Sequence, residues 1–260
     1  MNVNEVNAAL LNGRVDDFGV FPHLDSLRLS PVIFEFDFGL PSLPVEPGII
    51  LIRGPRQYGK STWLEMQLRD TILRFGPSSG LYLNGDELSN ASQLYTQIQT
   101  ALSLFPKNAS VKRVFIDEIT SVAGWEKSLK RLADSGEIRD VLVITTGSKA
   151  TDLRRGTERL PGRKGKLSRT LYYFTPVSYA SFKQACGDRL GADTLNAYLL
   201  SGGSPIAAAE LAANSLLPEY VIEMTRDWIH GECAASGRDR SSLHGIFESI
   251  VRHGGSPSGQ

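Results

Sequence analysis

The chain has 260 residues, of which 41% are hydrophobic and 22% are charged, and its 28 basic and 28 acidic residues cancel. This composition argues against a disordered chain, and the balanced charge argues against a global field that attracts nucleic acid or an anionic membrane. The two cysteines, Cys186 and Cys233, lie far apart and form no CxxC pair, which argues against a disulfide framework and favours a reducing compartment.

Residues 1–30 form the predicted N-terminal extension, with a short helix around Val6 to Leu11 and loops after it. The first residues lack the basic start and the apolar run that make up a signal peptide. Apolar stretches elsewhere in the chain are shorter than the roughly 18 residues that a membrane helix needs. We therefore expect a cytoplasmic protein that does not bind a membrane.

Residues 31–175 are expected to form the core domain, because short apolar runs alternate there with amphipathic helical patterns. The apolar runs predict strands at residues 49–52, 81–83, 111–116, 141–145 and 171–174. Between these runs, Leu64, Leu94 and Trp125 each begin a stripe of apolar residues spaced three or four positions apart, which predicts a helix packed on the sheet. The alternation indicates an α/β fold with a mainly parallel sheet.

A phosphate-binding loop is predicted between the first strand and the helix that follows it. The segment RGPRQYGKST contains GxxxxGKS in the strand-loop-helix context that this motif requires. Inward-facing backbone N–H groups and the positive end of the helix dipole would together form an anion cradle for ATP or ADP. The residues expected to bind the nucleotide are Gly54, Pro55, Arg56, Gln57, Tyr58, Gly59, Lys60, Ser61 and Thr62. The alternative interpretation is a glycine-rich turn with an exposed lysine.

Four residues of the loop have individual predicted roles. Lys60 would reach the β- and γ-phosphates, Ser61 would offer its hydroxyl to Mg²⁺, and Thr62 would contact the α-phosphate. Glycine is expected at Gly54 and Gly59 because a side chain would block the approach of the phosphates or forbid the backbone angles.

A second acidic motif follows the predicted strand VKRVFIDE. We expect Asp117 to orient Mg²⁺ together with Ser61, and Glu118 to polarise the water that attacks the γ-phosphate. An acid directly after the magnesium ligand favours an ATPase over a GTPase, and the chain contains no NKxD guanine-reading motif. Two solvated acids at the end of a strand are the alternative.

The next predicted strand, VLVITTGS, also ends in polar residues. If it lies beside the strand of Asp117, Thr146 or Ser148 would contact the γ-phosphate or the attacking water. A simple turn cap is the alternative interpretation.

A basic segment, TDLRRGTERLPGRKGKLSR, follows this strand and is expected to be exposed and mobile. It offers candidates for an arginine finger that neutralises charge on the transferred phosphoryl group, with Arg163 as first choice and Arg159 as second. A solvated loop and a DNA-backbone contact are the alternatives. Residues 176–252 then predict a small helical lid domain, and residues 253–260 a disordered tail.

These motifs occur in an order that resembles one group of prokaryotic AAA+ class P-loop ATPases. The pattern of that group is matched by GPRQYGKST from Gly54, by IDE from Ile116 and a following GW, by TGSKA, by LPGR and by PVSYASF. The resemblance implies a parallel five-stranded sheet with a helical lid, Thr146 to Ser148 in a sensor role, Arg163 as the matching arginine, and GGSP at residues 202–205 as a turn of the lid.

The chain departs from the pattern of this group at two positions, Thr120 where glutamine is common and Tyr179 where phenylalanine is common. Neither position touches the phosphate chemistry. Members of the group usually continue into a winged-helix-like domain. By comparison with them, we expect this chain to lack that domain.

The predicted function is Mg²⁺-dependent ATP hydrolysis coupled to movement of the lid. One alternative is a regulatory module that binds the nucleotide and hydrolyses it slowly, and another is a DNA-binding module that uses the basic segment. A homo-oligomer in which Arg163 acts in trans is a further expectation, while a DNA or protein partner stays open.

Overall fold

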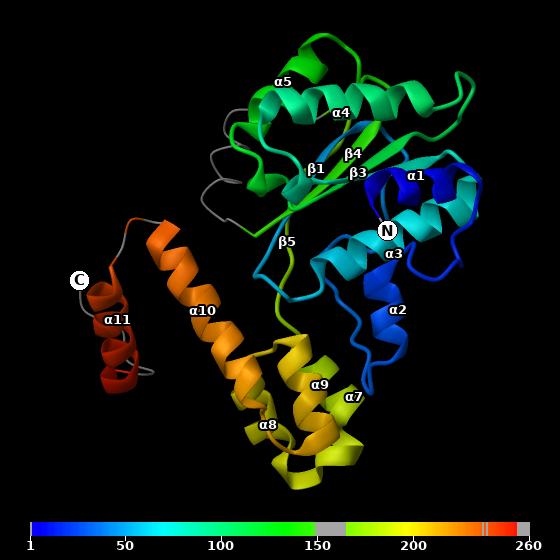
Figure 1. Cartoon of the computed structure of the whole chain (residues 1–260). Helices are drawn as coiled ribbons and strands as arrows, with labels where there is room; N and C mark the ends of the chain where they lie inside the picture. The colour runs from blue at the N-terminus through cyan, green and yellow to red at the C-terminus, as the bar shows by residue number, and fades with distance from the viewer. Residues whose placement is uncertain (1, 149–164, 236, 238, 254–260) are drawn as a thin grey trace.

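The structure of the chain is a computed structural model that describes residues 2–148, 165–235, 237 and 239–253. Its centre is a five-stranded sheet in which every pair of neighbouring strands is parallel (Figure 1). The strand order is β2-β3-β4-β1-β5, and the strands are β1 (Gly48–Arg53), β2 (Gly80–Asn84), β3 (Arg113–Asp117), β4 (Leu142–Gly147) and β5 (Leu171–Tyr173). The prediction of an α/β fold with a parallel five-stranded sheet is confirmed.

Helices cover both faces of the sheet, because successive residues of each strand point to opposite sides. In β1, Ile50 and Ile52 pack against α3 (Lys60–Phe75), whereas Ile49 and Leu51 join the core beneath α4 (Ala91–Leu104) and α5 (Trp125–Asp134). The strands are therefore buried on both faces, and the fold is a three-layer sandwich.

The N-terminal helix α1 (Val3–Leu11) covers the β2 edge of the sheet. The side-chain amide of Asn7 donates to the Tyr82 carbonyl at 2.8 Å, and its oxygen accepts from the Tyr82 N–H at 2.7 Å. This one side chain pairs both backbone groups of Tyr82 on the open side of the edge strand, which blocks pairing with another chain there.

A second helix, α2 (Pro22–Arg28), lies where the sequence predicted only loops, so that prediction was wrong. Its N-cap residue, Phe21, has no side-chain acceptor for the first-turn amides. The buried carboxylate of Glu65 on α3 accepts instead from the backbone N–H groups of His23 and Leu24, at 3.0 and 3.1 Å. The cap comes from 41 residues away in sequence, so local sequence gave no cap signal.

The contact between His23 and Glu65 makes stability depend on pH. His23 Nδ1 lies 2.6 Å from Glu65 Oε1, and this hydrogen bond raises the pKa of His23 above its ordinary value of 6.5 against the opposing effect of burial. A raised folded-state pKa stabilises the protein fully below pH 6.5, and this contribution is lost as pH rises through the folded-state pKa. The melting temperature of wild type should exceed that of His23→Gln most at about pH 5.5 and least at about pH 8.5. A difference independent of pH would contradict this.

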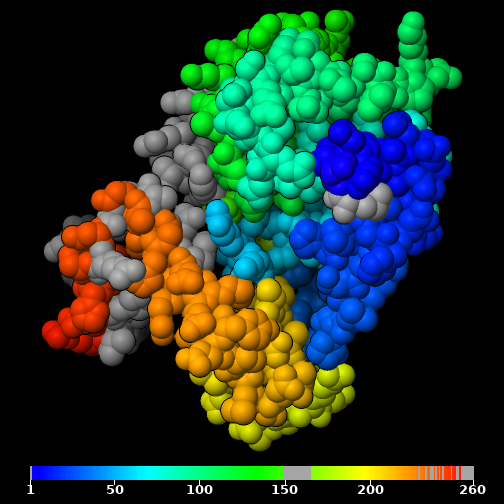
Figure 2. Space-filling model, viewed as in Figure 1, coloured from blue at the N-terminus to red at the C-terminus, as the bar shows by residue number. Residues whose placement is uncertain are grey.

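The C-terminal part of the described chain is helical. Helices α7 (Tyr179–Leu190), α8 (Thr194–Ser201) and α9 (Pro205–Asn214) share one apolar core, and α10 (Glu219–Ala235) leads to α11 (Arg240–His253). In the space-filling view these helices gather on one side of the molecule (Figure 2). His253 ends α11, so the helix extends one residue into the predicted tail, and residues 254–260 lie outside the described chain.

An extended segment at residues 32–38 joins the helical part to the sheet part. Phe34 stacks on Phe182 of α7, Phe36 packs on Phe174, and Phe38 lies edge-on to Trp63 of α3. The segment thereby belongs to both apolar cores at once. In the described parts of the chain, no helix has the length and apolar character needed to cross a membrane.

Candidate functional site

The carboxyl ends of β1, β3 and β4 meet at one edge of the sheet, which is where open α/β sheets bind ligands. The loop after β1 runs from Gly54 to Gly59 and leads directly into α3. Asp117 is the last residue of β3. Thr146 is the last but one residue of β4 and pairs with Ile52 of β1. The fold therefore brings the three predicted motifs to one place.

Two residues of the loop adopt left-handed backbone angles, Gln57 with φ of 61° and Gly59 with φ of 97°. At Gly59 a side chain would strain this conformation. Gly54 is needed for a different reason, because a Cβ atom there would lie 2.7 Å from the Phe174 carbonyl oxygen. Its close neighbour is the residue that follows β5, and this explains the glycine without reference to a ligand.

The start of α3 has the features of an anion site. Its N-cap residue, Gly59, provides no side-chain acceptor for the first-turn amides, and no acidic side chain lies in the first turn. Such amides carry partial positive charge at the N-terminus of a 16-residue helix. Ser61 and Thr62 lie half-buried in this first turn. The loop and helix thus offer backbone donors for a polyphosphate.

The ammonium group of Lys60 is buried beside these amides, with 3% of the side chain exposed. It donates to the Pro55 carbonyl at 2.8 Å and lies 3.5 Å from Glu118 Oε1. Burial lowers the pKa of Lys60, while the carboxylates of Glu118 and Asp117 oppose this shift. An ammonium group has three N–H donors, so Lys60 can serve a phosphate as well as its protein neighbours.

Thr146 connects the two acidic residues. Its hydroxyl donates to Asp117 Oδ1, and it accepts from the backbone N–H of Glu118 at 3.0 Å. The same N–H also lies 3.1 Å from Asp117 Oδ1. These bonds hold Glu118 in a left-handed conformation, with φ of 44° and ψ of 46°, that non-glycine residues seldom adopt. Strain of this kind persists only where surrounding contacts impose it.

The carboxylate of Glu118 is held from two sides. Its Oε2 accepts from the backbone N–H of Ser148 at 3.2 Å and from the Ser148 hydroxyl at 3.1 Å, while Oε1 faces Lys60. Arg56 Nε donates to the same hydroxyl at 3.3 Å. Lys60, Asp117, Glu118, Thr146 and Ser148 therefore form one connected network. The predicted arginine fingers, Arg163 and Arg159, lie outside the described residues.

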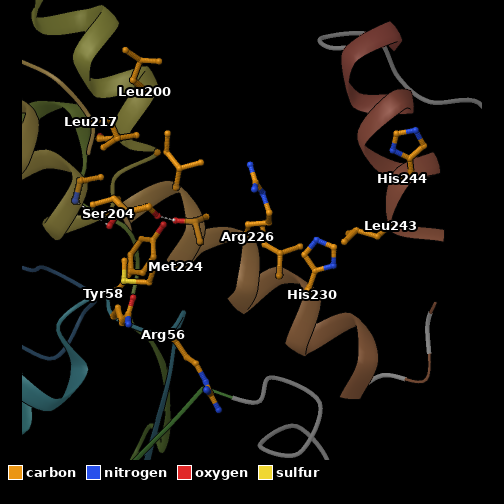
Figure 3. A pocket seen from close by; sticks show the side chains of 18 residues that line it. Arg56, Tyr58, Leu200, Ser204, Leu217, Met224, Arg226, His230, Leu243 and His244 are labelled. Atoms are coloured by element: carbon orange, nitrogen blue, oxygen red, sulfur yellow. Dashed lines mark hydrogen bonds between the residues drawn. The ribbon is translucent and has the colours of Figure 1, made fainter. Parts of the chain in front are cut away.

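A cavity of about 780 Å³ adjoins the loop on the side of the C-terminal helices (Figure 3). Arg56, Gln57 and Tyr58 line one wall, and residues of α8 to α11, with the turns between them, line the rest. Ser204 of the GGSP turn and Arg226 of α10 are among these residues. Sequence reasoning missed the contribution of α10, because its helical pattern carries no signal that it faces a loop far away in the chain.

Oxygen atoms of the kind that bind magnesium lie at the end of β3 and in the first turn of α3. Mg²⁺ is usually bound by one or two protein oxygens together with phosphates and water. Asp117 at the end of β3 and Ser61 in the first turn of α3 supply such oxygens. Among the described residues there is no cluster of three or more His, Cys, Asp or Glu side chains that could hold a metal without a further ligand.

A family model described as an AAA domain matches residues 46–182, just over half of the chain. The chain is also 30% identical over 113 residues to the uncharacterized protein MJ1637 of Methanocaldococcus jannaschii. That alignment covers 42% of this chain and 23% of the archaeal protein, so the chain corresponds to less than a quarter of that relative.

Two solved structures are similar at low sequence identity. A variant of RuvB from Thermotoga maritima is 15% identical, with a TM-score of 0.45, over 82% of this chain and 71% of its own. The Orc1 protein of Aeropyrum pernix, solved in complex with DNA, is 14% identical, with a TM-score of 0.45, over 94% of this chain and 65% of its own.

Proposed function

Because this chain belongs to the AAA domain family, we propose that it binds Mg-ATP in the loop of residues 54–62 and hydrolyses it to ADP and phosphate. The observation that carries the proposal is the position of Glu118. Its carboxylate lies 3.5 Å from the Lys60 ammonium, beside the uncapped N-terminus of α3. A base is thus next to the site expected to hold the γ-phosphate.

Lys60 and the backbone of the loop would bind the triphosphate. The Lys60 ammonium would turn from Glu118 toward the β- and γ-phosphates, because a bond to a negatively charged phosphate oxygen is stronger than its bond to the neutral Pro55 carbonyl. Ser61 and Asp117 are the residues that would hold magnesium. The ion, when bound, supplies positive charge that offsets the charge on the phosphate oxygens.

Glu118 would then act as the base. A water oxygen forms a bond to the γ-phosphorus, the bond from that phosphorus to the β–γ bridging oxygen breaks, and ADP leaves with the electron pair. One proton of the water passes to the Glu118 carboxylate. Thr146 would fix the orientation of the Glu118 carboxylate, because its hydroxyl oxygen accepts from the strained backbone N–H of Glu118. Its hydroxyl proton is donated to Asp117.

The cavity supports coupling between the nucleotide and the C-terminal helices. Tyr58 of the loop and Ser204 at the start of α9 line the same space. A nucleoside extending from the loop into this space would contact both parts of the chain, so its binding and release would favour different positions of the helices. In this proposal residues 176–252 act as a lid on the core of residues 31–175.

A second candidate function, slow hydrolysis by a nucleotide-dependent regulator, is favoured by the contacts of Glu118 within the chain. Both carboxylate oxygens face donors, Oε2 toward Ser148 and Oε1 toward Lys60. A base held in this way must exchange partners before it accepts a proton, which slows turnover. A partner that releases Glu118 would then control the reaction.

Steady-state phosphate release tests the proposed function. We expect turnover of ATP with Mg²⁺, loss of turnover with excess EDTA, and recovery when Mg²⁺ is restored, because the ion offsets phosphate charge. The assay should be repeated over a range of protein concentrations. A rate per subunit that rises with concentration would support a homo-oligomer with Arg163 acting in trans. Turnover unaffected by EDTA would contradict the role of Ser61 and Asp117.

A further inference from the structure

We infer that Arg56 is a positioning residue for Glu118 and acts through the hydroxyl of Ser148. The inference rests on the proposed function, because it assigns a role in the reaction to an arginine of the phosphate loop. Arg56 and Ser148 are 92 positions apart in the chain and come from different loops at the same edge of the sheet.

The direction of each hydrogen bond follows from the chemistry of the groups. A guanidinium group only donates, so the Ser148 hydroxyl accepts from Arg56 Nε at 3.3 Å. A hydroxyl has one proton, and the carboxylate only accepts, so Ser148 donates to Glu118 Oε2 at 3.1 Å. The chain of bonds therefore runs one way, from the guanidinium through the hydroxyl to the carboxylate.

This direction decides what each oxygen of Glu118 can do. Oε2 is occupied by the hydroxyl and backbone N–H of Ser148, whereas Oε1 faces only the ammonium of Lys60 among the contacts of the described residues. When Lys60 turns to the phosphates, Oε1 becomes the oxygen that accepts the proton of water. Ser148 keeps the carboxylate in one orientation during this step, and its own proton is not available to a phosphate.

Arg56 links this orientation to the loop. Ser148 is buried, with 8% of the residue exposed, whereas Arg56 is exposed and lines the cavity. In Figure 3 its side chain extends away from Arg226 and His230 of α10. If the loop rearranges around a nucleotide, the bond from Arg56 to Ser148 is strengthened or broken. The orientation of the Glu118 carboxylate then depends on the conformation of the loop.

The experiment is a double-mutant cycle on ATP turnover with Arg56→Ala, Ser148→Ala and the double variant. Loss of positioning should lower kcat about tenfold in each single variant, because small misplacements of a catalytic group have effects of this size or larger. If Arg56 acts through Ser148, the double variant should be no slower than Ser148→Ala, since the effects of coupled residues are not additive. KM and the Kd for ADP, measured by calorimetry, should change less than about twofold.

Two further variants separate positioning from a structural effect. Ser148→Thr keeps the hydroxyl and should retain most of the wild-type kcat. Ser103→Ala removes a hydroxyl whose described hydrogen bond lies within α4, to the Thr100 carbonyl, and should leave kcat unchanged. Melting temperatures of all variants identify any change in folding, and a Ser148→Thr variant that folds but is as slow as Ser148→Ala would overturn the role of the hydroxyl.

Three results would overturn the inference. If the decreases in kcat of the two single variants multiply in the double variant, Arg56 acts independently of Ser148. A rise in KM and Kd with unchanged kcat in Arg56→Ala would mean that the guanidinium binds the phosphates directly. An unchanged kcat in Arg56→Ala would mean that the orientation of the Glu118 carboxylate does not depend on Arg56. Absence of turnover in wild type is a separate outcome, because it rejects the proposed hydrolysis itself.

Discussion

Glu118→Gln is expected to lower ATP turnover by about a hundredfold or more while nucleotide binding persists, because general bases contribute rate factors of this size. The amide has nearly the shape of the carboxylate and can still accept from Ser148, but it cannot take a proton from water. Calorimetry with Mg-ADP and Mg-ATP should give affinities close to those of wild type. Single-turnover phosphate release would show that the chemical step is the step that slows.

Glu87→Gln is the matched control for this substitution. Glu87 follows the neighbouring strand, β2, and is exposed, and its described contact is a 3.4 Å hydrogen bond from Asn84. Turnover should be unchanged in this variant. Equal turnover in wild type and Glu118→Gln would mean that another group, or no group, accepts the proton, and would reject the mechanism proposed for this site.

The sheet could be predicted from the sequence because each strand is a short apolar run buried on both faces. Ile49 to Ile52 illustrates this, since its even-numbered residues pack under α3 and its odd-numbered residues under α4 and α5. The phosphate loop could be predicted for a similar reason, because its strand, glycines and helix are contiguous. Local patterns suffice where the interactions that decide the structure are local.

The parts that could not be predicted depend on contacts between distant residues. Helix α2 begins where Glu65, on another helix, caps its first turn, and Phe21 before it carries no cap signal. Thr146 or Ser148 was predicted to contact the γ-phosphate or the attacking water, with a turn cap as the alternative. The Thr146 hydroxyl bonds to Asp117 and the Ser148 hydroxyl bonds to Glu118, and only the alignment of β3 beside β4 reveals these contacts.

The motif predicts which residues belong to the site, but it does not predict which contacts require them. Gly54 fits the loop motif, yet the atom that excludes a side chain there belongs to Phe174, beyond β5. Similarly, the carboxylate that faces Lys60 at 3.5 Å is Glu118, so the predicted base and the predicted phosphate-binding lysine contact each other. Sequence spacing carries no information on such contacts.

Lys60→Ala is expected to weaken ATP binding about ten- to a hundredfold, because a hydrogen bond to a charged group contributes about 1.5–3 kcal/mol. The loss in kcat should be larger, about a hundred- to a thousandfold, if Lys60 also offsets charge that develops on the phosphoryl oxygens during the reaction. Titration calorimetry measures the first effect, and turnover at saturating ATP measures the second.

Thermal unfolding separates this loss from a folding defect. The Lys60 ammonium is buried at an energetic cost, as the burial-lowered pKa shows, so its removal need not destabilise the nucleotide-free protein. Mg-ADP should raise the melting temperature of wild type and of Lys130→Ala, a control at an exposed lysine of α5, because a ligand that binds only the folded state stabilises it. The increase should vanish or shrink in Lys60→Ala. An equal increase in all three proteins would mean that nucleotide is bound without this ammonium, and the loop of residues 54–62 would not be the polyphosphate site.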